Sequence, residues 1–249
     1  MTPVEQMEQA IASLQSSVSG DDAKDAWEQE RIDSALHYHF DWAATIIEML
    51  GGKKVHPTWM VTGGVNESLS DAKRDEMLQL ADEGLDIAKR TYAFYKSDVV
   101  GKFADEAKNF GNFPTMFLSL VTPKGGLEHY DGFIRIKDAE GNIVEDMVPT
   151  DDYERIIGEA VEPFSYMKFP YFKPLGYPNG IYRVGPLARL NNCDSCGTPF
   201  ADVALAEFRT LQESSPVSSS FHYHYARLVE IIFALESMER LLKDPQILD

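Results

Sequence analysis

The stretch Ile181–Phe200 reads IYRVGPLARLNNCDSCGTPF and joins a segment rich in proline and aromatic residues to the most strongly helical part of the chain. Its Gly185-Pro186 pair predicts a turn, because proline fixes φ and has no backbone N–H to donate. Both cysteines of the chain, Cys193 and Cys196, fall here as a Cys-x-x-Cys. We therefore expect any redox or metal chemistry of this chain to lie near this stretch.

Helical periodicity dominates on both sides of this stretch. Apolar residues recur at intervals of three to five over 23–50, which predicts a long helix ended by the glycine pair at 51–52. Ser70 is a suitable N-cap for a second helix. Residues 200–211 and 222–242 show the same periodicity and predict two more helices.

A β element is expected between these helices. The run 113–122 is rich in β-branched and aromatic residues, and two further runs flank a turn at 138–141. In the resulting hairpin, Ile134 and Ile136 share one face. Residues 151–162 are expected to form a short helix.

Two segments have less regular patterns. The stretch 163–182 is rich in Pro, Tyr and Phe, and we expect it to be packed, because aromatic side chains are costly to leave in water. Residues 1–22 are polar and predict a loosely attached segment with a short amphipathic helix. The predicted fold is mainly α with a small β element.

Length and composition restrict the class of protein. The chain has 249 residues, 44% of them hydrophobic, and can bury a core as one domain or two small ones. It contains no run of about 18 uncharged apolar residues and no recognisable secretory signal. Two cysteines do not make a disulfide framework. We expect a single domain over 1–249 in a cytoplasmic protein that does not bind membranes.

The charge balance excludes one class of partner. Acidic residues outnumber basic ones by 40 to 23, for a formal net charge of −17. Such a surface repels nucleic acid unless basic residues gather in a patch, and the sequence has no Lys/Arg cluster. The simplest interpretation of the acidity is a solvated surface.

Four blocks of sequence resemble a known family in order and spacing: GGKKVHPTWMVTGGV at 51–65, HYDGFIRI at 129–136, YERIIGEAVEPFSYMKFPYFK at 153–173, and VGPLARLN with CD-x-x-x-TP-x-A at 184–201. They resemble the large, catalytic subunit of nickel–iron hydrogenases, in particular the soluble, bidirectional NAD(P)-linked group. The resemblance covers about four-fifths of the chain, from near Ile46 onward. It implies that subunit's helical core, with H2 oxidation or proton reduction as the parent reaction.

The resemblance also implies what this chain lacks. The family holds its nickel–iron centre with cysteines of an N-terminal Arg-x-Cys-x-x-Cys and a C-terminal Asp-Pro-Cys-x-x-Cys, and neither motif is present. The Arg-Gly-x-Glu glutamate associated with proton transfer is also missing. We expect this chain alone to bind no cofactor, to hold no metal, to contain no catalytic residue and to be inactive. Its ends would be truncated, would lie on other polypeptides, or would be lost in a metal-free scaffold like the related subunit of respiratory complex I.

The family's partners follow from the same resemblance. A small subunit with iron–sulfur clusters receives the electrons, and separate subunits bind flavin and NAD(P). The chain itself has no Gly-x-Gly-x-x-Gly and no P-loop, so we do not expect it to bind NAD. By resemblance, His56, Gly63, Gly64 and Val65 would form the contact with the small subunit near its cluster. A loop histidine with a structural hydrogen bond is the alternative, and the His-Pro dipeptide predicts extended backbone at His56.

The cysteine pair has several interpretations. A nickel–iron or zinc site needs two more soft ligands beside Cys193 and Cys196, and the chain has no other cysteine. Buried or surface cysteines without a metal are the simplest interpretation. A helical protein with a redox or zinc Cys-x-x-Cys is the alternative from another class. The His-Tyr-His triplets at 37–39 and 222–224 lie in predicted helices, where their histidines point apart and do not share a metal.

Two arginines in the central stretch are the charges expected inside. A buried arginine needs a carboxylate or several carbonyl oxygens. We expect Arg183 and Arg189 to form a structural network that holds the central turn, with Glu159, Glu162 and Asp194 as candidate partners.

Overall fold

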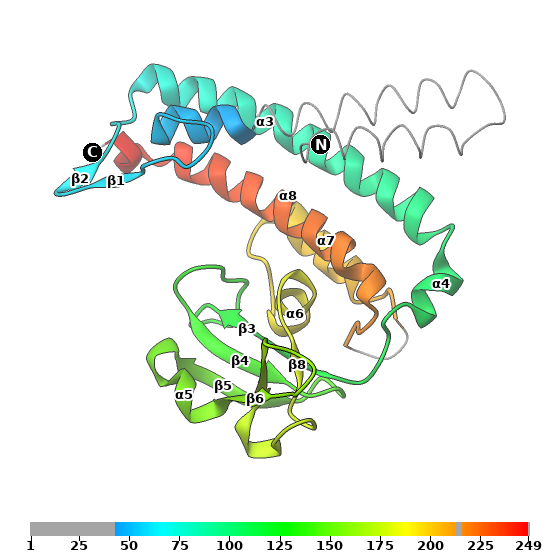
Figure 1. Cartoon of the computed structure of the whole chain (residues 1–249). Coiled ribbons are helices and arrows are strands. Elements are labelled where there is room, and N and C mark those ends of the chain that lie inside the picture. The colour runs from blue at the N-terminus through cyan, green and yellow to red at the C-terminus, as the bar shows by residue number, and fades with distance from the viewer. Residues whose placement is uncertain (1–42, 213–215, 249) are drawn as a thin grey trace. The chain divides into compact units, whose positions relative to one another are not determined.

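The computed structural model describes residues 43–212 and 216–248 (Figure 1). Two compact units make up the chain, one reaching Leu80 and the other running from Ala81 to Ile247. No helix within the described ranges is long and apolar enough to cross a membrane.

The helix predicted over 23–50 is described only at its end, and the segment 1–22 lies outside the described residues. Residues 43–51 are helical. Gly52 ends this helix with φ at 71°, and its N–H donates to the carbonyl of Glu48 at 2.8 Å. The glycine stop is therefore confirmed, because glycine adopts positive φ without the steric cost that a side chain brings.

A short hairpin and a long helix follow. Strands β1 (Met60–Val61) and β2 (Gly64–Val65) pair antiparallel around a two-residue turn. Helix α3 (Asp71–Phe94) begins after Ser70, whose Oγ accepts the backbone N–H of Lys73 at 3.3 Å. The predicted N-cap is confirmed.

The second unit contains the main sheet. After α3, a π-helical turn (Tyr95–Val100) and helix α4 (Ala104–Asn109) lead into it. The sheet has the strand order β5-β4-β3-β8, with β3 and β8 parallel and the other pairs antiparallel. Its strands are β3 (Met116–Val121), β4 (Phe133–Lys137), β5 (Ile143–Pro149) and β8 (Tyr182–Arg183).

The two faces of this sheet follow the period-two alternation of strands. Ile134 and Ile136 lie on one face, in an apolar cluster with Met116, as the hairpin pattern predicts. The other face carries the buried side chains of Phe117 and Val121 and, unexpectedly, of Arg135. A buried guanidinium needs partners, and those of Arg135 lie on β5 and in the central stretch.

The helix predicted over 151–162 is mostly wrong. Only Thr150–Asp152 (a 3-10 turn) and helix α5 (Tyr153–Ile156) are helical, and strand β6 (Ile157–Val161) follows. Strand β6 pairs with β7 (Lys168–Phe172) in a two-stranded ribbon. This pairing outweighs the helical propensity of the segment, and Tyr171 lies over Gly158, where a Cβ would come within 2.7 Å of the ring.

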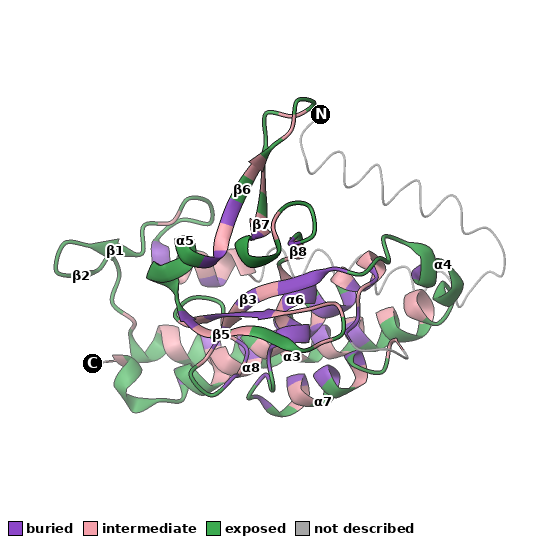
Figure 2. Ribbon diagram, turned by 90° about the horizontal axis from the view of Figure 1, so that it is seen from below, coloured by how far each residue is buried: buried purple, intermediate pink, exposed green. Residues whose placement is uncertain are grey.

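The expectation that the aromatic stretch 163–182 is packed holds only in part. Phe172 is buried in the apolar cluster of the sheet. Phe164 and Tyr166, in contrast, are 79% and 98% exposed. The reason is geometric, because β6 and β7 project from the sheet and the loop that joins them lies at their far end (Figure 2).

Three helices complete the second unit. Helix α6 (Pro186–Asn192) contacts β3 and β4 on one side and α8 (Tyr223–Leu242) on the other. Helix α7 (Pro199–Phe208) packs on α8, so α6 lies between the sheet and the helical layer (Figure 1). The two C-terminal helices are confirmed, and the described chain is mainly helical with a smaller β part.

Candidate functional site

The Cys-x-x-Cys loop follows α6 directly, and its two cysteines are buried while Asp194 and Ser195 are exposed. The exposed fractions of Cys193 and Cys196 are 0% and 5%, and both are free thiols. The Cys193 thiol lies 3.8 Å from the carbonyl oxygen of Leu190, to which it donates. Its hydrogen bond with Cys196, together with burial, raises the pKa of the Cys196 thiol. A thiol whose pKa is raised stays protonated and is a poor nucleophile at neutral pH.

Backbone contacts hold this loop on both sides. The Asp194 N–H donates to the carbonyl of Gly125 at 2.7 Å, and the Leu127 N–H donates to that of Ser195 at 2.8 Å. Gly125 has φ of 80°, and a Cβ on it would come within 2.0 Å of an Asp194 carboxylate oxygen. A glycine is therefore required where the two loops cross.

Side chains of α7 and the segment after it fix the loop from the helical side. Asp202 accepts the backbone N–H of Cys196 at 2.6 Å and that of Gly197 at 3.2 Å. Arg209 donates to the carbonyl of Cys193 at 2.6 Å. These bonds satisfy backbone groups of the two buried cysteines, which would otherwise lack partners.

Arg135 connects the loop to the sheet. Its guanidinium forms a bidentate pair with Asp146, at 2.8 and 3.1 Å, and contacts both carboxylate oxygens of Asp194 at 3.1 Å. It also donates to the carbonyl of Asn192 at 3.1 Å. The hydrogen bond from Arg135 lowers the pKa of Asp146. Sequence reasoning missed Arg135, because a charge between two isoleucines of a strand is typical of a solvent-facing position.

The structure places the two predicted arginines in separate contacts. Arg189 forms a bidentate pair with Glu230 of α8, at 2.5 and 2.9 Å. Arg183 donates to Ser220 Oγ at 2.8 Å and to the carbonyl of Gly111 at 2.6 Å. Both contacts join distant segments, as a structural network would, but the suggested partners are wrong.

The partner that the sequence did not suggest is Glu230. It is 8% exposed, and His129 Nε2 lies 3.5 Å from its carboxylate. Burial alone would raise the pKa of Glu230, but the hydrogen bonds from Arg189 and His129 outweigh burial and lower it. Asp194, one of the suggested carboxylates, pairs with Arg135 instead.

A second polar cluster joins α3, α7 and α8. The Tyr92 hydroxyl lies 2.5 Å from both the Tyr225 hydroxyl and the Glu207 carboxylate, and Lys96 pairs with Glu207 at 2.8 Å. Burial raises the pKa of Tyr225 to about 12, so both phenols are neutral at neutral pH. The cluster fixes the helices to one another.

The His56 loop lies in the first unit and is exposed. The backbone of His56 has φ of 51°, so the extended conformation predicted for it is wrong. The physical reason is that Pro57 packs against Gly51 at the end of the helix, where a Cβ on Gly51 would come within 2.3 Å of the Pro57 Cβ. The chain therefore turns back at His56 instead of running on in an extended conformation. Gly63, with φ of 88°, lies in the turn of the hairpin.

The described residues contain no group suited to hold a metal. No set of three or more His, Cys, Asp and Glu side chains converges within 43–212 and 216–248. His222 is buried at the start of α8, whereas His224 is exposed beside Arg227, so this triplet does not converge. The triplet at 37–39 lies outside the described residues.

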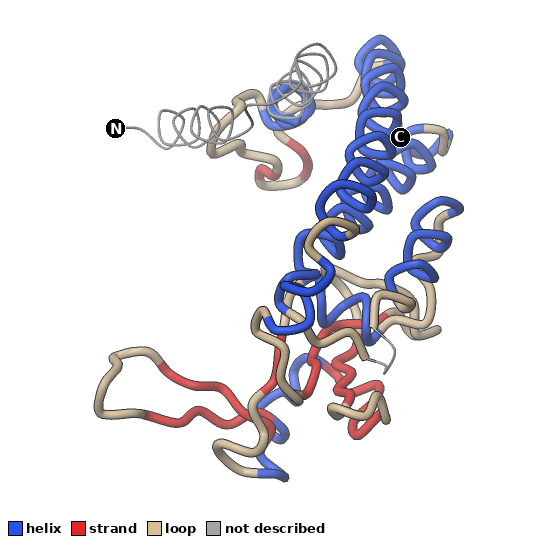
Figure 3. The backbone as a smooth tube through the Cα atoms, turned by 90° about the vertical axis from the view of Figure 1, so that its right-hand side faces the viewer, coloured by secondary structure: helices blue, strands red, loops and turns tan. Residues whose placement is uncertain are grey.

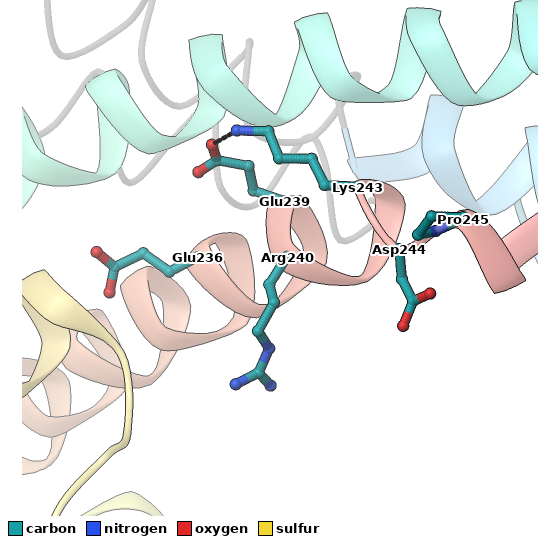
Figure 4. Close-up of a pocket in the computed structure, with 6 residues that line it drawn as sticks. All are labelled: Glu236, Glu239, Arg240, Lys243, Asp244 and Pro245. Atoms are coloured by element: carbon teal, nitrogen blue, oxygen red, sulfur yellow. Dashed lines mark hydrogen bonds and ion pairs between the residues drawn. The ribbon is translucent and has the colours of Figure 1, made fainter.

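A shallow groove runs along the end of α8, but its side chains do not form a site. In Figure 4, Glu239 and Lys243 point toward each other, whereas the side chains of Glu236, Arg240 and Asp244 point in other directions and do not converge. Glu239 pairs with Lys243, and Glu236 accepts the N–H groups of Phe200 and Ala201 at the start of α7. These groups stabilise helices and leave little free for a ligand.

The fold defines a structural class. The chain aligns with the crystal structure of an NAD+-reducing NiFe-hydrogenase at a TM-score of 0.77 and 39% identity, covering 83% of this chain and 46% of that one. A NiFeSe hydrogenase from Desulfovibrio vulgaris Hildenborough aligns at a TM-score of 0.60 and 18% identity, which supports the fold alone. The architecture matches that of a NiFe-hydrogenase large subunit.

The sequence comparison gives the particular relatives. The chain is 37% identical over 202 residues to a subunit of the vhu F420-non-reducing hydrogenase of Methanocaldococcus jannaschii, covering 81% of this chain and 47% of the relative. It is 36% identical over 213 residues to the beta subunit of the NAD-reducing hydrogenase HoxS of Cupriavidus necator, covering 83% of this chain and 43% of the relative. No family model matches. The chain spans about half the length of the curated relatives it matches.

Proposed function

We propose that this chain forms part of the large subunit of a nickel–iron hydrogenase of the NAD(P)-linked group. The observation that carries the proposal is the likeness to an NAD+-reducing NiFe-hydrogenase, with 39% identity and a TM-score of 0.77 over 83% of the chain. The assembled enzyme would catalyse H2 → 2 H+ + 2 e−, or its reverse, and exchange electrons with NAD(P) through partner subunits.

The residues described here do not fit a nickel–iron centre. The two thiols are buried and hydrogen-bonded to each other, and no further ligand group converges on them among the described residues. A site that needs four soft ligands cannot be completed by the two cysteines of this chain. The chain would therefore contribute scaffold and binding surface, and alone it would be inactive.

The hairpin of the first unit supports a contact with the small, cluster-bearing subunit. Met60 and Val65 are 80% and 60% exposed, and Val55 in the same loop is 70% exposed. Apolar side chains gathered in this way mark a protein contact. His56, Gly63 and Gly64 would lie within it, and subunits that bind flavin and NAD(P) would complete the assembly in the cytoplasm.

Co-elution with a small subunit tests the proposal. The full chain, produced together with the small subunit of the C. necator enzyme, should co-elute with it in gel filtration. Met60→Ser/Val65→Ser should weaken that complex, whereas Val203→Ser, at a position 56% exposed on α7, should not. Failure of the unaltered chain to associate would contradict the proposal.

A metal-free scaffold subunit is the second candidate. It is favoured by the lack of a converging ligand group among the described residues. Measuring nickel after the rest of the hydrogenase subunit is supplied distinguishes the hydrogenase part from the metal-free scaffold, because only a hydrogenase assembly would gain nickel. A redox or zinc Cys-x-x-Cys protein is less well supported, since both thiols are buried.

A further inference from the structure

The loop around β1 and β2 carries positive charge on an acidic protein. We define residues 52–66 as the hairpin segment, which Figure 3 shows as two short strands joined by loops to the helices on either side. The segment contains Lys53, Lys54 and His56 but no Asp or Glu. In the whole chain, acidic residues outnumber basic ones by 40 to 23. The sign of the local charge is therefore opposite to that of the chain.

The two lysines have no counter-charge in this chain. Lys53 and Lys54 are exposed, and among the described residues no carboxylate pairs with either of them. Glu67, the next acidic residue along the chain, already pairs with Lys73 at 2.6 Å. Lys73 also donates to the carbonyl of Met49 at 3.2 Å, which holds this pair at the start of α3. The ammonium groups of Lys53 and Lys54 are thus available to another molecule.

The same segment exposes apolar side chains beside these charges. Val55 directly follows Lys54 and is 70% exposed, and Trp59, just before β1, is 41% exposed. A protein contact typically has an apolar centre with a polar rim that stays in water. The rim of this surface is cationic. The surface that complements it is an apolar patch with carboxylates at its edge.

The backbone of the hairpin segment is fixed by its own hydrogen bonds. Strands β1 and β2 pair antiparallel, and the N–H of Asn66 donates to the carbonyl of Trp59 at 2.9 Å. The N–H of Thr58 donates to the carbonyl of Gly51 at 3.3 Å. A preformed loop loses little conformational entropy when it binds. The bases of the two lysine side chains are therefore held at defined positions.

Other acidic partners fit the charges less well. Nucleic acid and anionic lipid surfaces are negative over a wide area, so a chain with a net charge of −17 is repelled by both. In a symmetric dimer the same patch meets itself, and Lys53 and Lys54 would then face the same lysines of the second copy. A different polypeptide with a local group of carboxylates avoids both difficulties.

We propose that Lys53 and Lys54 pair with carboxylates at the edge of an apolar patch on the small subunit, and that these charges steer its association with the hairpin segment. This inference rests on the proposed function and adds the chemistry of the partner's surface to it. Attraction between opposite charges raises the association rate and fixes the orientation of approach, and salt weakens both effects. The net negative charge of the chain repels the same carboxylates elsewhere, which favours approach from the side of the hairpin segment.

Binding kinetics of the full chain test the inference. The probe is the small subunit of the C. necator enzyme, immobilised for surface plasmon resonance at about 50 mM and about 500 mM NaCl. Lys53→Gln/Lys54→Gln should lower the association rate constant at low salt by about tenfold and leave the dissociation rate constant within about twofold. Its association should also depend less on salt than that of the unaltered chain.

The matched control is Lys124→Gln/Lys168→Gln. It changes the net charge by the same amount, at two exposed lysines of the second unit that pair with no carboxylate among the described residues. The association rate constant of this variant should stay within about twofold of the unaltered chain. Circular dichroism confirms that each variant is folded.

The outcomes separate the inference from the proposed function. If the unaltered chain binds the small subunit but the hairpin variant associates as fast, or if salt has no effect, the inference is wrong while the proposed function stands. Equal slowing of both variants would show that net charge alone acts, and would also overturn the inference. A dimer of the unaltered chain that the hairpin variant loses would make a second copy the partner and contradict it. If the unaltered chain does not bind the small subunit, the proposed function itself fails.

Discussion

The pair between Arg189 and Glu230 offers the sharpest test of how the central stretch is held. Its two hydrogen bonds are 2.5 and 2.9 Å long and join α6 to α8. Glu230→Gln keeps the shape of the side chain but removes the charge, so Arg189 is left facing a neutral amide. The Arg189 side chain is 25% exposed, so water compensates part of the loss. Breaking a fully buried pair costs about 3–5 kcal/mol, and we expect about 2 kcal/mol here.

Urea unfolding followed by circular dichroism at the helical band measures this free energy. The double variant Arg189→Met/Glu230→Leu should recover most of the loss, because apolar side chains need no compensating charge. Glu239→Gln is the matched control on the same helix. Its partner Lys243 is 62% exposed, so the change should stay within about 0.5 kcal/mol.

The pH dependence gives an independent check on the same pair. Because the pKa of Glu230 is lowered below its usual value of 4.5, its contribution is fully present above pH 4.5. It is lost as the pH falls through the lower pKa of the folded state. The stability difference between the unaltered chain and Glu230→Gln should therefore shrink in acid. A single variant that loses less than about 0.5 kcal/mol, or a double variant as unstable as the single one, would refute the reasoning.

Two further results are expected. Tyr92→Phe removes the hydroxyl between Tyr225 and Glu207 and should lower the free energy of unfolding in urea by about 1–2 kcal/mol. Tyr130→Phe, at a position 92% exposed, should not change it measurably. Equal effects of the two variants would contradict the helix-joining role of the cluster. Cys193 and Cys196 should react slowly with a thiol reagent in the native chain and rapidly in denaturant, and two fast thiols at neutral pH would contradict their burial.

Local patterns in the sequence predicted much of the fold. The apolar spacing over 222–242 predicted α8, and alternation predicted the hairpin of β4 and β5, because both patterns report which face of an element is buried. Strand β6 was missed, since its conformation depends on pairing with β7 and not on its own residues. Local propensity is a weak guide where a tertiary contact decides.

The polar contacts of the candidate site were harder to predict. Arg135 and Asp194 lie 59 positions apart, and Tyr92 and Tyr225 lie 133 apart. No periodicity links such residues, so a sequence indicates that a buried arginine needs a carboxylate but not which one. Glu230 was not among the three candidate partners for this reason, because only the packing of α6 against α8 brings it within reach of Arg189.

The nickel content of the purified chain tests the central claim most directly. We expect the full chain produced alone to hold far less than one nickel, because the described residues provide no converging ligand set. Produced with the small subunit plus the remainder of a hydrogenase large subunit, it should enter a complex that contains nickel. About one tightly bound nickel in the chain alone would contradict the account, since it would require ligands that the scaffold is not expected to have.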